Sequence, residues 1–231
     1  MHLSIIIPAL NEAAAIGETL AAVFVACPGA EVIVVDGGSS DETQTIARAS
    51  GATVLQTKRG RGHQQNAGVN AATGDTFLFL HADTLLPPDA DTAIEQSLAD
   101  RQTIGGNFRL RFAPPSLLNH LFATVYNFRS RTARHYYGDS AIFLRRDIWE
   151  KLGGFREGML MEDWELVCRL ETHAKETGTR TVCLPQTVTT SARRFEGKRR
   201  LRYVLLWAYL HYLHARGVSG DELARKYPDV R

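Results

Sequence analysis

The chain has 231 residues, of which 44% are hydrophobic and 23% charged, as in an ordinary globular protein. Its net charge of +2 gives no reason to expect a nucleic-acid partner, and we expect none. The three cysteines form no CxxC pair, which favours reduced thiols and a cytoplasmic location. The first residues predict no signal peptide, and the apolar stretch 203–213 is about half as long as a membrane-spanning helix.

Short apolar runs alternate with helical periods in the first half of the chain. Strands are predicted at 3–7, 32–35, 54–55 and 77–80, with helices between them. Ser39 and Glu42 have the spacing of a capping box and predict a helix start, while Gly51 and Gly74 suit positions just beyond helix ends. This alternation is typical of βαβ units, so we expect an α/β protein with a mainly parallel sheet and flanking helices.

The second half follows a different order. Strands are predicted at 107–112, 141–144 and 181–184, and helices at 117–128, around 148–152, at 162–173 and from about 198 onward. No repeat, low-complexity tract or linker interrupts the chain. We therefore expect a single domain over 1–231, with a first half at 1–112, a second half at 113–195 and a basic helical extension at 196–231.

Polar residues follow three of the predicted strands. In open α/β sheets the ligand binds beyond the carboxyl ends of the strands. Each segment alone also fits a solvated loop with a helix cap, but three together predict one polar rim. A hard divalent cation prefers carboxylate oxygens, which makes the acid after the third of these strands the candidate ligand. The residues are Pro8, Asn11 and Glu12, then Asp36, then His81 and Asp83.

A series of motifs in this order resembles glycosyltransferase family 2 over roughly residues 3–195. The motifs are SIIIP at 4–8 with Asn11-Glu12, VVDGGSSDET at 34–43, GRG at 60–62, NAG at 66–68, ATGD at 72–75, FLHADT at 79–84, GDSAIF at 138–143, KLGGF at 151–155 and MEDWEL at 161–166. None is decisive alone, whereas the ordered set is specific.

The resemblance implies a GT-A fold and an inverting hexosyltransferase that uses a nucleotide-diphosphate sugar. Residues 1–112 would bind the donor, and residues 113–195 would bind a glycan or lipid-linked acceptor and catalyse transfer. By the same resemblance Asp36 contacts the base, Asn11 and Glu12 belong to the donor loop, and Asp83 is the last acid of an Asp-x-Asp motif that holds Mn²⁺ or Mg²⁺. Asp163 matches the catalytic base.

Two positions depart from the family pattern. His81 stands where the first Asp of Asp-x-Asp would be, and Gly37 replaces a frequently acidic position. An imidazole is able to ligate manganese, so His81 is either a metal ligand or a hydrogen-bonded histidine at the strand end. A catalytically weak or inactive nucleotide-sugar-binding or glycan-binding module is therefore the alternative function. A nucleotidylyltransferase or a dinucleotide-binding dehydrogenase would need a glycine-rich loop after the first strand, and this chain has none.

The second half supplies candidates for catalysis and acceptor binding. An inverting transfer needs a carboxylate that takes the acceptor proton, and Asp163 is our candidate, with Glu162 beside it; both also suit the dipole of a helix start. Trp164 fits either stacking on a sugar or a place in the core, and Asp139 either an acceptor contact or a turn. In the first half of the chain, the resemblance places Arg61 where a basic residue approaches the donor.

Basic residues gather near the end of the chain. Six lysines and arginines lie within 193–202, followed by the aromatic-rich stretch 203–210. Such a segment docks peripherally on anionic membrane or, alternatively, packs on the domain with a solvated basic collar. Arg193 and Arg194 are also candidates for binding the diphosphate.

Overall fold

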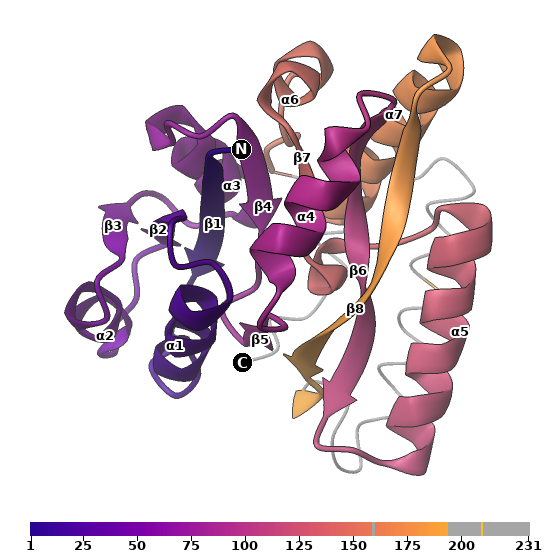
Figure 1. The fold of residues 1–231 in the computed structure, drawn as a ribbon. Coiled ribbons are helices and arrows are strands. Elements are labelled where there is room, and N and C mark those ends of the chain that lie inside the picture. Colours follow the sequence, from indigo (N-terminus) through magenta and orange to yellow (C-terminus); the bar gives the residue numbers. More distant parts are fainter. Residues whose placement is uncertain (159, 194–208, 210–231) are drawn as a thin grey trace.

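A computed structural model describes residues 1–158, 160–193 and 209 of the chain (Figure 1). The strands are β1 (Leu3–Ala9), β2 (Glu31–Asp36), β3 (Thr53–Gln56), β4 (Thr76–Phe79), β5 (Thr84–Leu85), β6 (Thr103–Ala113), β7 (Ile142–Arg145) and β8 (Arg180–Ser191). The helices are α1 (Ile16–Ala26), α2 (Thr43–Ala49), α3 (Arg61–Ala71), α4 (Ala90–Ala99), α5 (Leu117–Ala133), α6 (Arg146–Leu152) and α7 (Glu162–Thr177), with a short 3-10 helix η1 (Gly138–Ser140).

The described strands form one mixed sheet in the order β3-β2-β1-β4-β7-β6-β8-β5. Strands β3, β2, β1 and β4 run parallel, β7 is antiparallel to both β4 and β6, and β8 runs parallel to β6. Strand β1 lies between β2 and β4, so the chain leaves it toward one side and returns on the other. Such a reversal of strand order is where α/β sheets bind ligands. The predicted α/β class with a mostly parallel sheet is confirmed.

The sheet is buried on both faces, and this explains its continuous apolar strands. Successive side chains of a strand point to opposite faces, so Ile5 and Ile7 join one core cluster while Ile6 joins the other. The first cluster includes Leu20 of α1. The second includes Leu166 of α7. Helices on both faces thus hold the central strands in place.

Several details of the predicted elements are wrong or incomplete. Strand β5 and helix α4 were not predicted, and β8 extends well beyond the predicted 181–184. Helix α2 begins at Thr43 without a side-chain cap, so Ser39 and Glu42 form no capping box. Gly51 does follow a helix end with φ of 94°, but Gly74 does not, because α3 already ends at Ala71. Gly74 instead lies against Ser4, where a Cβ would overlap the Ser4 hydroxyl.

The predicted extension at 196–231, its helix and Arg194 lie outside the described residues. Within the part of the chain that the structure describes, no helix is long and apolar enough to cross a bilayer.

Candidate active site

The carboxyl ends of β1, β2 and β4 meet at one edge of the sheet, where the sequence predicts the polar rim. At the end of β2, the buried carboxylate of Asp36 is held by its own loop. Its Oδ2 accepts the N–H groups of Gly38 and Ser39, each at 2.9 Å, and the Gln44 side-chain amide at 2.8 Å, while the Ser39 hydroxyl donates to Oδ1. Asp36 therefore fixes the shape of the loop that faces the ligand edge.

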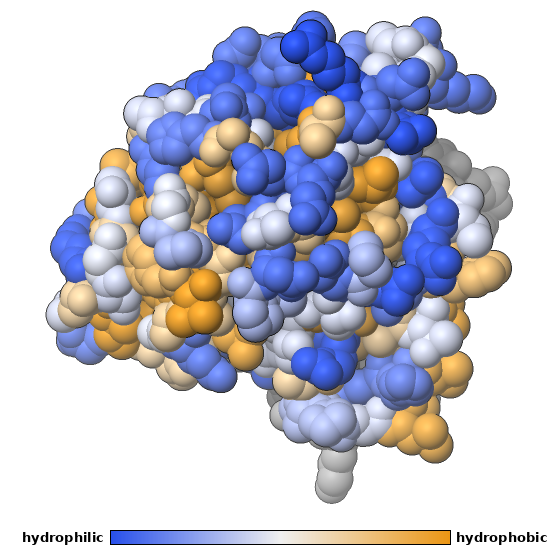
Figure 2. Space-filling view, viewed as in Figure 1, coloured by the Kyte–Doolittle hydropathy of each residue, from blue (hydrophilic) through white to orange (hydrophobic). Residues whose placement is uncertain are grey.

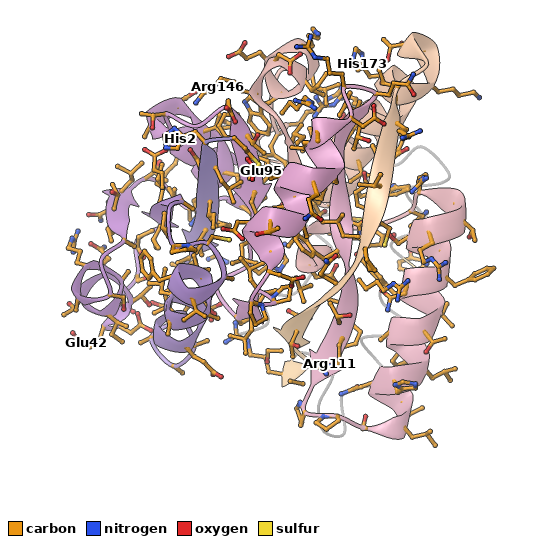
Figure 3. The ribbon with its side chains drawn as sticks, in the orientation of Figure 1. His2, Glu42, Glu95, Arg111, Arg146 and His173 are labelled. Atoms are coloured by element: carbon orange, nitrogen blue, oxygen red, sulfur yellow. The ribbon has the colours of Figure 1, made fainter. Side chains whose placement is uncertain are left out.

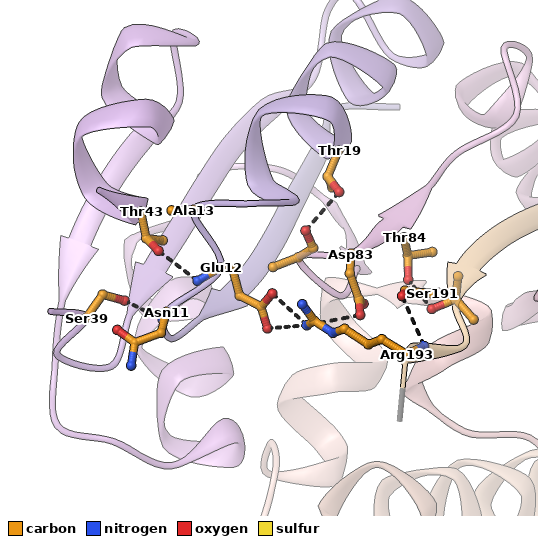
Figure 4. Close-up of polar contacts among 12 residues, drawn as sticks. Asn11, Glu12, Ala13, Thr19, Ser39, Thr43, Asp83, Thr84, Ser191 and Arg193 are labelled. Atoms are coloured by element: carbon orange, nitrogen blue, oxygen red, sulfur yellow. Dashed lines mark hydrogen bonds and ion pairs between the residues drawn. The ribbon is translucent and has the colours of Figure 1, made fainter. Parts of the chain in front are cut away.

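The loops after β1 and β2 are joined by side-chain hydrogen bonds (Figure 4). The Asn11 N–H donates to Ser39 Oγ at 2.8 Å, and the Ser40 N–H donates to Asn11 Oδ1 at 2.8 Å. The Glu12 N–H donates to Thr43 Oγ1 at 2.8 Å. Asn11 has φ of 54°, a left-handed conformation that asparagine adopts more readily than most residues. Pro8 pairs in register with Val35 just before this loop. Ser39, Ser40 and Thr43 thus link the two loops.

A buried glutamine on helix α3 holds the ends of β1 and β2 together. Gln64 of α3 donates through Nε2 to the carbonyl oxygens of Ala9 at 2.9 Å and Val35 at 2.7 Å. A Cβ at Gly37 would come within 3.1 Å of the Gln64 amide. This explains why glycine, not an acid, follows Asp36 here. Nothing in the sequence singled out Gln64 beyond its place on the helix that follows the glycine-containing motif at 60–62.

Two carboxylates converge on one guanidinium at this edge (Figure 4). Arg193 Nη2 lies 2.5 Å from Glu12 Oε1, 2.6 Å from Glu12 Oε2 and 3.1 Å from Asp83 Oδ2. Burial alone would lower the pKa of Arg193, but the hydrogen bond that it donates to Glu12 and the charges of Asp83 and Glu12 raise it above its ordinary value. The loop after β1, the loop after β4 and the end of β8 therefore share one charge cluster.

The same pair of acids suits a divalent cation. Mg²⁺ and related ions bind through one or two carboxylates and complete their shell with substrate phosphates and water. Glu12 and Asp83 already surround a positive group, and both side chains are mostly buried, at 15% and 12% exposed. Among residues 1–158, 160–193 and 209 no group of three or more His, Cys, Asp or Glu gathers as a complete protein cage. The donor set therefore fits a cation that is shared with a diphosphate.

Asp163 lies at the first turn of α7 with its carboxylate fixed by backbone donors. The Gly138 N–H donates to its Oδ2 at 2.7 Å, and the Trp164 N–H donates to its Oδ1 at 2.8 Å. A Cβ at Gly138 would lie 2.9 Å from His81 Nε2 and 3.1 Å from Asp163 Oδ2. The histidine ring and the carboxylate are therefore within about 6 Å of each other. The structure places His81 beside Asp163, and its role as a metal ligand stays a prediction.

Asp139 is the next carboxylate on this side. The Tyr126 hydroxyl donates to its Oδ1 at 2.7 Å. Burial raises the pKa of Asp139 to about 6, and the charge of Asp163 adds to the rise, while the Tyr126 hydrogen bond and the charge of Arg61 oppose it. Arg61 also lies near Glu162, with 3.7 Å between Nε and Oε1. The structure thus brings Arg61, Asp139, Glu162 and Asp163 together. Tyr126, which no sequence motif singled out, lies in the same group of residues.

The Trp164 side chain has a partial place in the core, and its stacking on a sugar stays a prediction. It packs against the second core cluster while remaining half-buried. Its ring stacks on His135 with centroids 3.8 Å apart and planes inclined by 30°, and it lies 5.4 Å from the Tyr137 ring. The His135 and Tyr137 side chains hydrogen-bond to each other at 2.5 Å. The rings of His135, Tyr137 and Trp164 therefore form an aromatic group next to Asp163.

Comparisons with known proteins agree with this arrangement. Residues 4–153 match the family Glycosyl transferase family 2. The 4,4'-diaponeurosporenoate glycosyltransferase of Staphylococcus aureus is 39% identical over 103 residues, which cover 41% of this chain and 28% of that protein.

Solved structures share the fold. A mannosyltransferase from Pyrobaculum calidifontis, in complex with GDP-Man and Mn²⁺, superposes with a TM-score of 0.69 at 22% identity and covers 91% of this chain and 61% of its own. S. aureus TarS 1-349 with UDP-GlcNAc gives 0.60 at 18% identity, covering 87% and 60%. Glucosyl-3-phosphoglycerate synthase from Mycobacterium tuberculosis with Mn²⁺ and UDP gives 0.58 at 20% identity, covering 82% and 70%.

The chain thus spans about three fifths of the first of these structures and 28% of the curated relative. The fold is that of GT-A glycosyltransferases, and the family match extends over most of the described residues. This chain belongs to glycosyl transferase family 2.

Proposed function

We propose that the chain transfers a sugar from a nucleotide-diphosphate donor to an acceptor hydroxyl, with inversion at the anomeric carbon. The observation that supports this most is that two pairs of carboxylates have different surroundings. Glu12 and Asp83 converge on a positive charge, whereas Asp163 is oriented by backbone N–H groups beside Asp139. One group suits the leaving diphosphate and the other the incoming hydroxyl.

On the donor side, Glu12 and Asp83 would hold Mn²⁺ or Mg²⁺, with His81 as a candidate third ligand. The cation would neutralise the charge that develops on the departing diphosphate. The loops carrying Asn11 and Asp36 would receive the base and ribose, and Arg193 would turn to the diphosphate once a cation replaces it. The complexes of the Pyrobaculum and Mycobacterium proteins with nucleotides and Mn²⁺ support this assignment.

On the acceptor side, Asp163 would take the proton of the acceptor hydroxyl as its oxygen attacks the anomeric carbon and the bond to the diphosphate breaks. Each carboxylate oxygen has two lone pairs, so an oxygen that accepts one backbone N–H still has room for a proton. The backbone bonds from Gly138 and Trp164 would aim the carboxylate before the substrate arrives. Asp139 and Glu162 would position the acceptor, Arg61 beside them would approach the donor, and Trp164 would offer a ring face to a sugar.

We further propose a lipid-linked or otherwise apolar acceptor, a single domain over 1–231 and a cytoplasmic location. The name of the S. aureus relative, a glycosyltransferase of a carotenoid acid, supports an apolar acceptor. The predicted membrane contact of the basic stretch at 193–202, with Arg194, remains a proposal because all of it except Arg193 lies outside the described residues.

Substitution of Asp163 by Asn tests the proposal, because it keeps the shape and removes the proton acceptor. We expect transfer from a panel of UDP-, GDP- and dTDP-sugars with Mn²⁺ to fall at least about 10²-fold, while nucleotide affinity stays near normal. Asp147→Asn, which alters a carboxylate on α6 that is 61% exposed, is the matched control.

Transfer by Asp163→Asn at close to the parent rate would place the base elsewhere, with Glu162 and Asp139 next to examine. A parent protein that binds a nucleotide sugar with Mn²⁺ but turns over none, even by slow hydrolysis, would favour the alternative of a binding module.

A further inference from the structure

Helix α5 presents an apolar face to solvent. Leu117 is 86% exposed, Phe128 67% and Leu121 55%. Val125, Leu118 and Phe122 are also exposed. At 100° per residue these six positions fall on one side of the helix, within an arc of about 140°. Figure 2 shows orange, hydrophobic side chains at the lower right of the molecule, over this helix.

The opposite side of α5 carries Tyr126, which packs against both core clusters, among small and polar residues, and it attaches the helix to the sheet. Ala123 and Ser130 are buried there, and the Ser130 hydroxyl exchanges hydrogen bonds with the Asn107 side chain of β6. Asn127 accepts the Leu110 N–H at 2.8 Å and donates to its carbonyl at 3.0 Å. The usual arrangement of a surface helix, apolar inside and polar outside, is thus reversed. An exposed apolar patch of this kind marks an interaction site.

The charge around this face identifies what it would contact. From residue 103 to 138 the chain has five arginines and no aspartate or glutamate. Arg129 and Arg131 are exposed in the last turns of α5, and Arg111 is exposed near the end of β6, toward the start of the helix (Figure 3). Arginines therefore lie at both ends of the apolar face, where long side chains reach headgroups while leucine and phenylalanine enter the acyl region.

We propose that α5 is an interfacial helix that docks the protein on a phospholipid bilayer containing anionic lipids. The same charge argues against a second copy of the chain as the partner, because it would oppose an equally basic face. Helix α5 ends just before His135 and Tyr137, which adjoin Trp164 next to Asp163. A docked protein would thus have its acceptor side near the bilayer surface.

Vesicle flotation of the full chain tests the proposal without any turnover, so it succeeds or fails separately from the transferase activity. The parent protein is expected to bind phosphatidylcholine vesicles with about 30% phosphatidylglycerol, and to bind less as salt screens the arginines. The triple variant L117Q/L121Q/F128Q should partition at least about tenfold more weakly, because three large side chains no longer enter the bilayer. V25Q changes a similarly exposed residue, 71% exposed on α1, and should bind as the parent does.

R129Q/R131Q should lose most of the preference for phosphatidylglycerol over pure phosphatidylcholine. Unchanged flotation of the triple variant would overturn the proposal. So would a fall of several degrees in its melting temperature, which would mean that the chain itself covers the face. A parent dimer in sedimentation that becomes a monomer in the triple variant, with vesicle binding unchanged, would assign the face to a second copy.

Discussion

Asp139 and Asp163 are neighbouring carboxylates in different surroundings. Asp163 accepts two backbone N–H groups, whereas Asp139 accepts the Tyr126 hydroxyl and has a pKa raised to about 6 by burial and by the charge of Asp163. Below about pH 6, Asp139 is expected to be protonated while it keeps its place beside Tyr126.

The raised pKa of Asp139 predicts a change of stability with pH. The folded state binds this proton more tightly than the unfolded state does, so its contribution is fully present below about pH 4 and is lost as pH rises to about 6. The loss amounts to no more than about 3 kcal/mol. Chemical unfolding of the parent and of Asp139→Asn between pH 4 and 7 measures it. The stability difference between the two should shift in favour of Asp139→Asn as pH rises, and a constant difference would refute the assignment.

Gly138 is required by a close approach, because it lies between His81 and Asp163. In Gly138→Ala the new methyl group would lie 2.9 Å from His81 Nε2 and 3.1 Å from Asp163 Oδ2, so one of these side chains must move. Displacing a positioned base costs about 10²-fold in rate, and we expect transfer to fall by about this factor with donor affinity retained. Gly29→Ala, where nothing lies within 4 Å of the new methyl group, is the control. Equal rates for the two variants would contradict this account.

At the scale of elements, local pattern predicted the strands and helices that bury a continuous or periodic apolar face. Strands β1, β2 and β4 and helix α7 belong to this group. Pattern missed what depends on distant partners: β5 is two residues long and exists through its pairing with β8, and β8 is long because it pairs along β6. The predicted capping box at Ser39 gave way to hydrogen bonds with Asp36 and Asn11, residues from two different loops.

Gln64 provides a test of how the strand ends are held. Gln64→Leu keeps most of the volume but removes the two bonds to the carbonyls of Ala9 and Val35. Buried groups left without a partner cost about 1–3 kcal/mol, so the free energy of unfolding should fall by about this amount. Denaturant titration measures it, with Gln102→Leu at an exposed position as control. A stability equal to that of the parent would show that Gln64 does not hold these loops.

At the scale of the whole molecule, the candidate site is assembled from both ends of the described chain. The sequence predicted its acids because each follows a strand or begins a helix. It did not predict that Arg193 contacts Glu12, because the two are 181 positions apart and are brought together by the pairing of β8 with β5 and β6. Tyr126 was missed because its role depends on Asp139, which lies beyond the end of helix α5.

The contact between Arg193 and the two acids predicts how the protein binds metal. In Arg193→Ala no guanidinium has to leave Glu12 and Asp83, so Mn²⁺ without nucleotide should bind several-fold to about tenfold more tightly. Calorimetry or Mn²⁺ resonance titration measures this affinity directly. Arg193→Lys should change it less, and Arg101→Ala not at all. An unchanged or weaker affinity in Arg193→Ala would separate the arginine from the cation site.

Arg193 is far in the sequence from the two acids that it contacts, and this matters while the protein is being synthesised. Glu12 and Asp83 are made early, and the guanidinium that faces them in the finished fold leaves the ribosome about 110 residues after Asp83. Strand β6 is likewise made before β8, so one of its edges is open in the meantime. Until β8 is made, a growing chain therefore has two acids without their arginine and a strand edge without its partner. The arrival of β8 pairs the strand edge and brings Arg193 to the two acids.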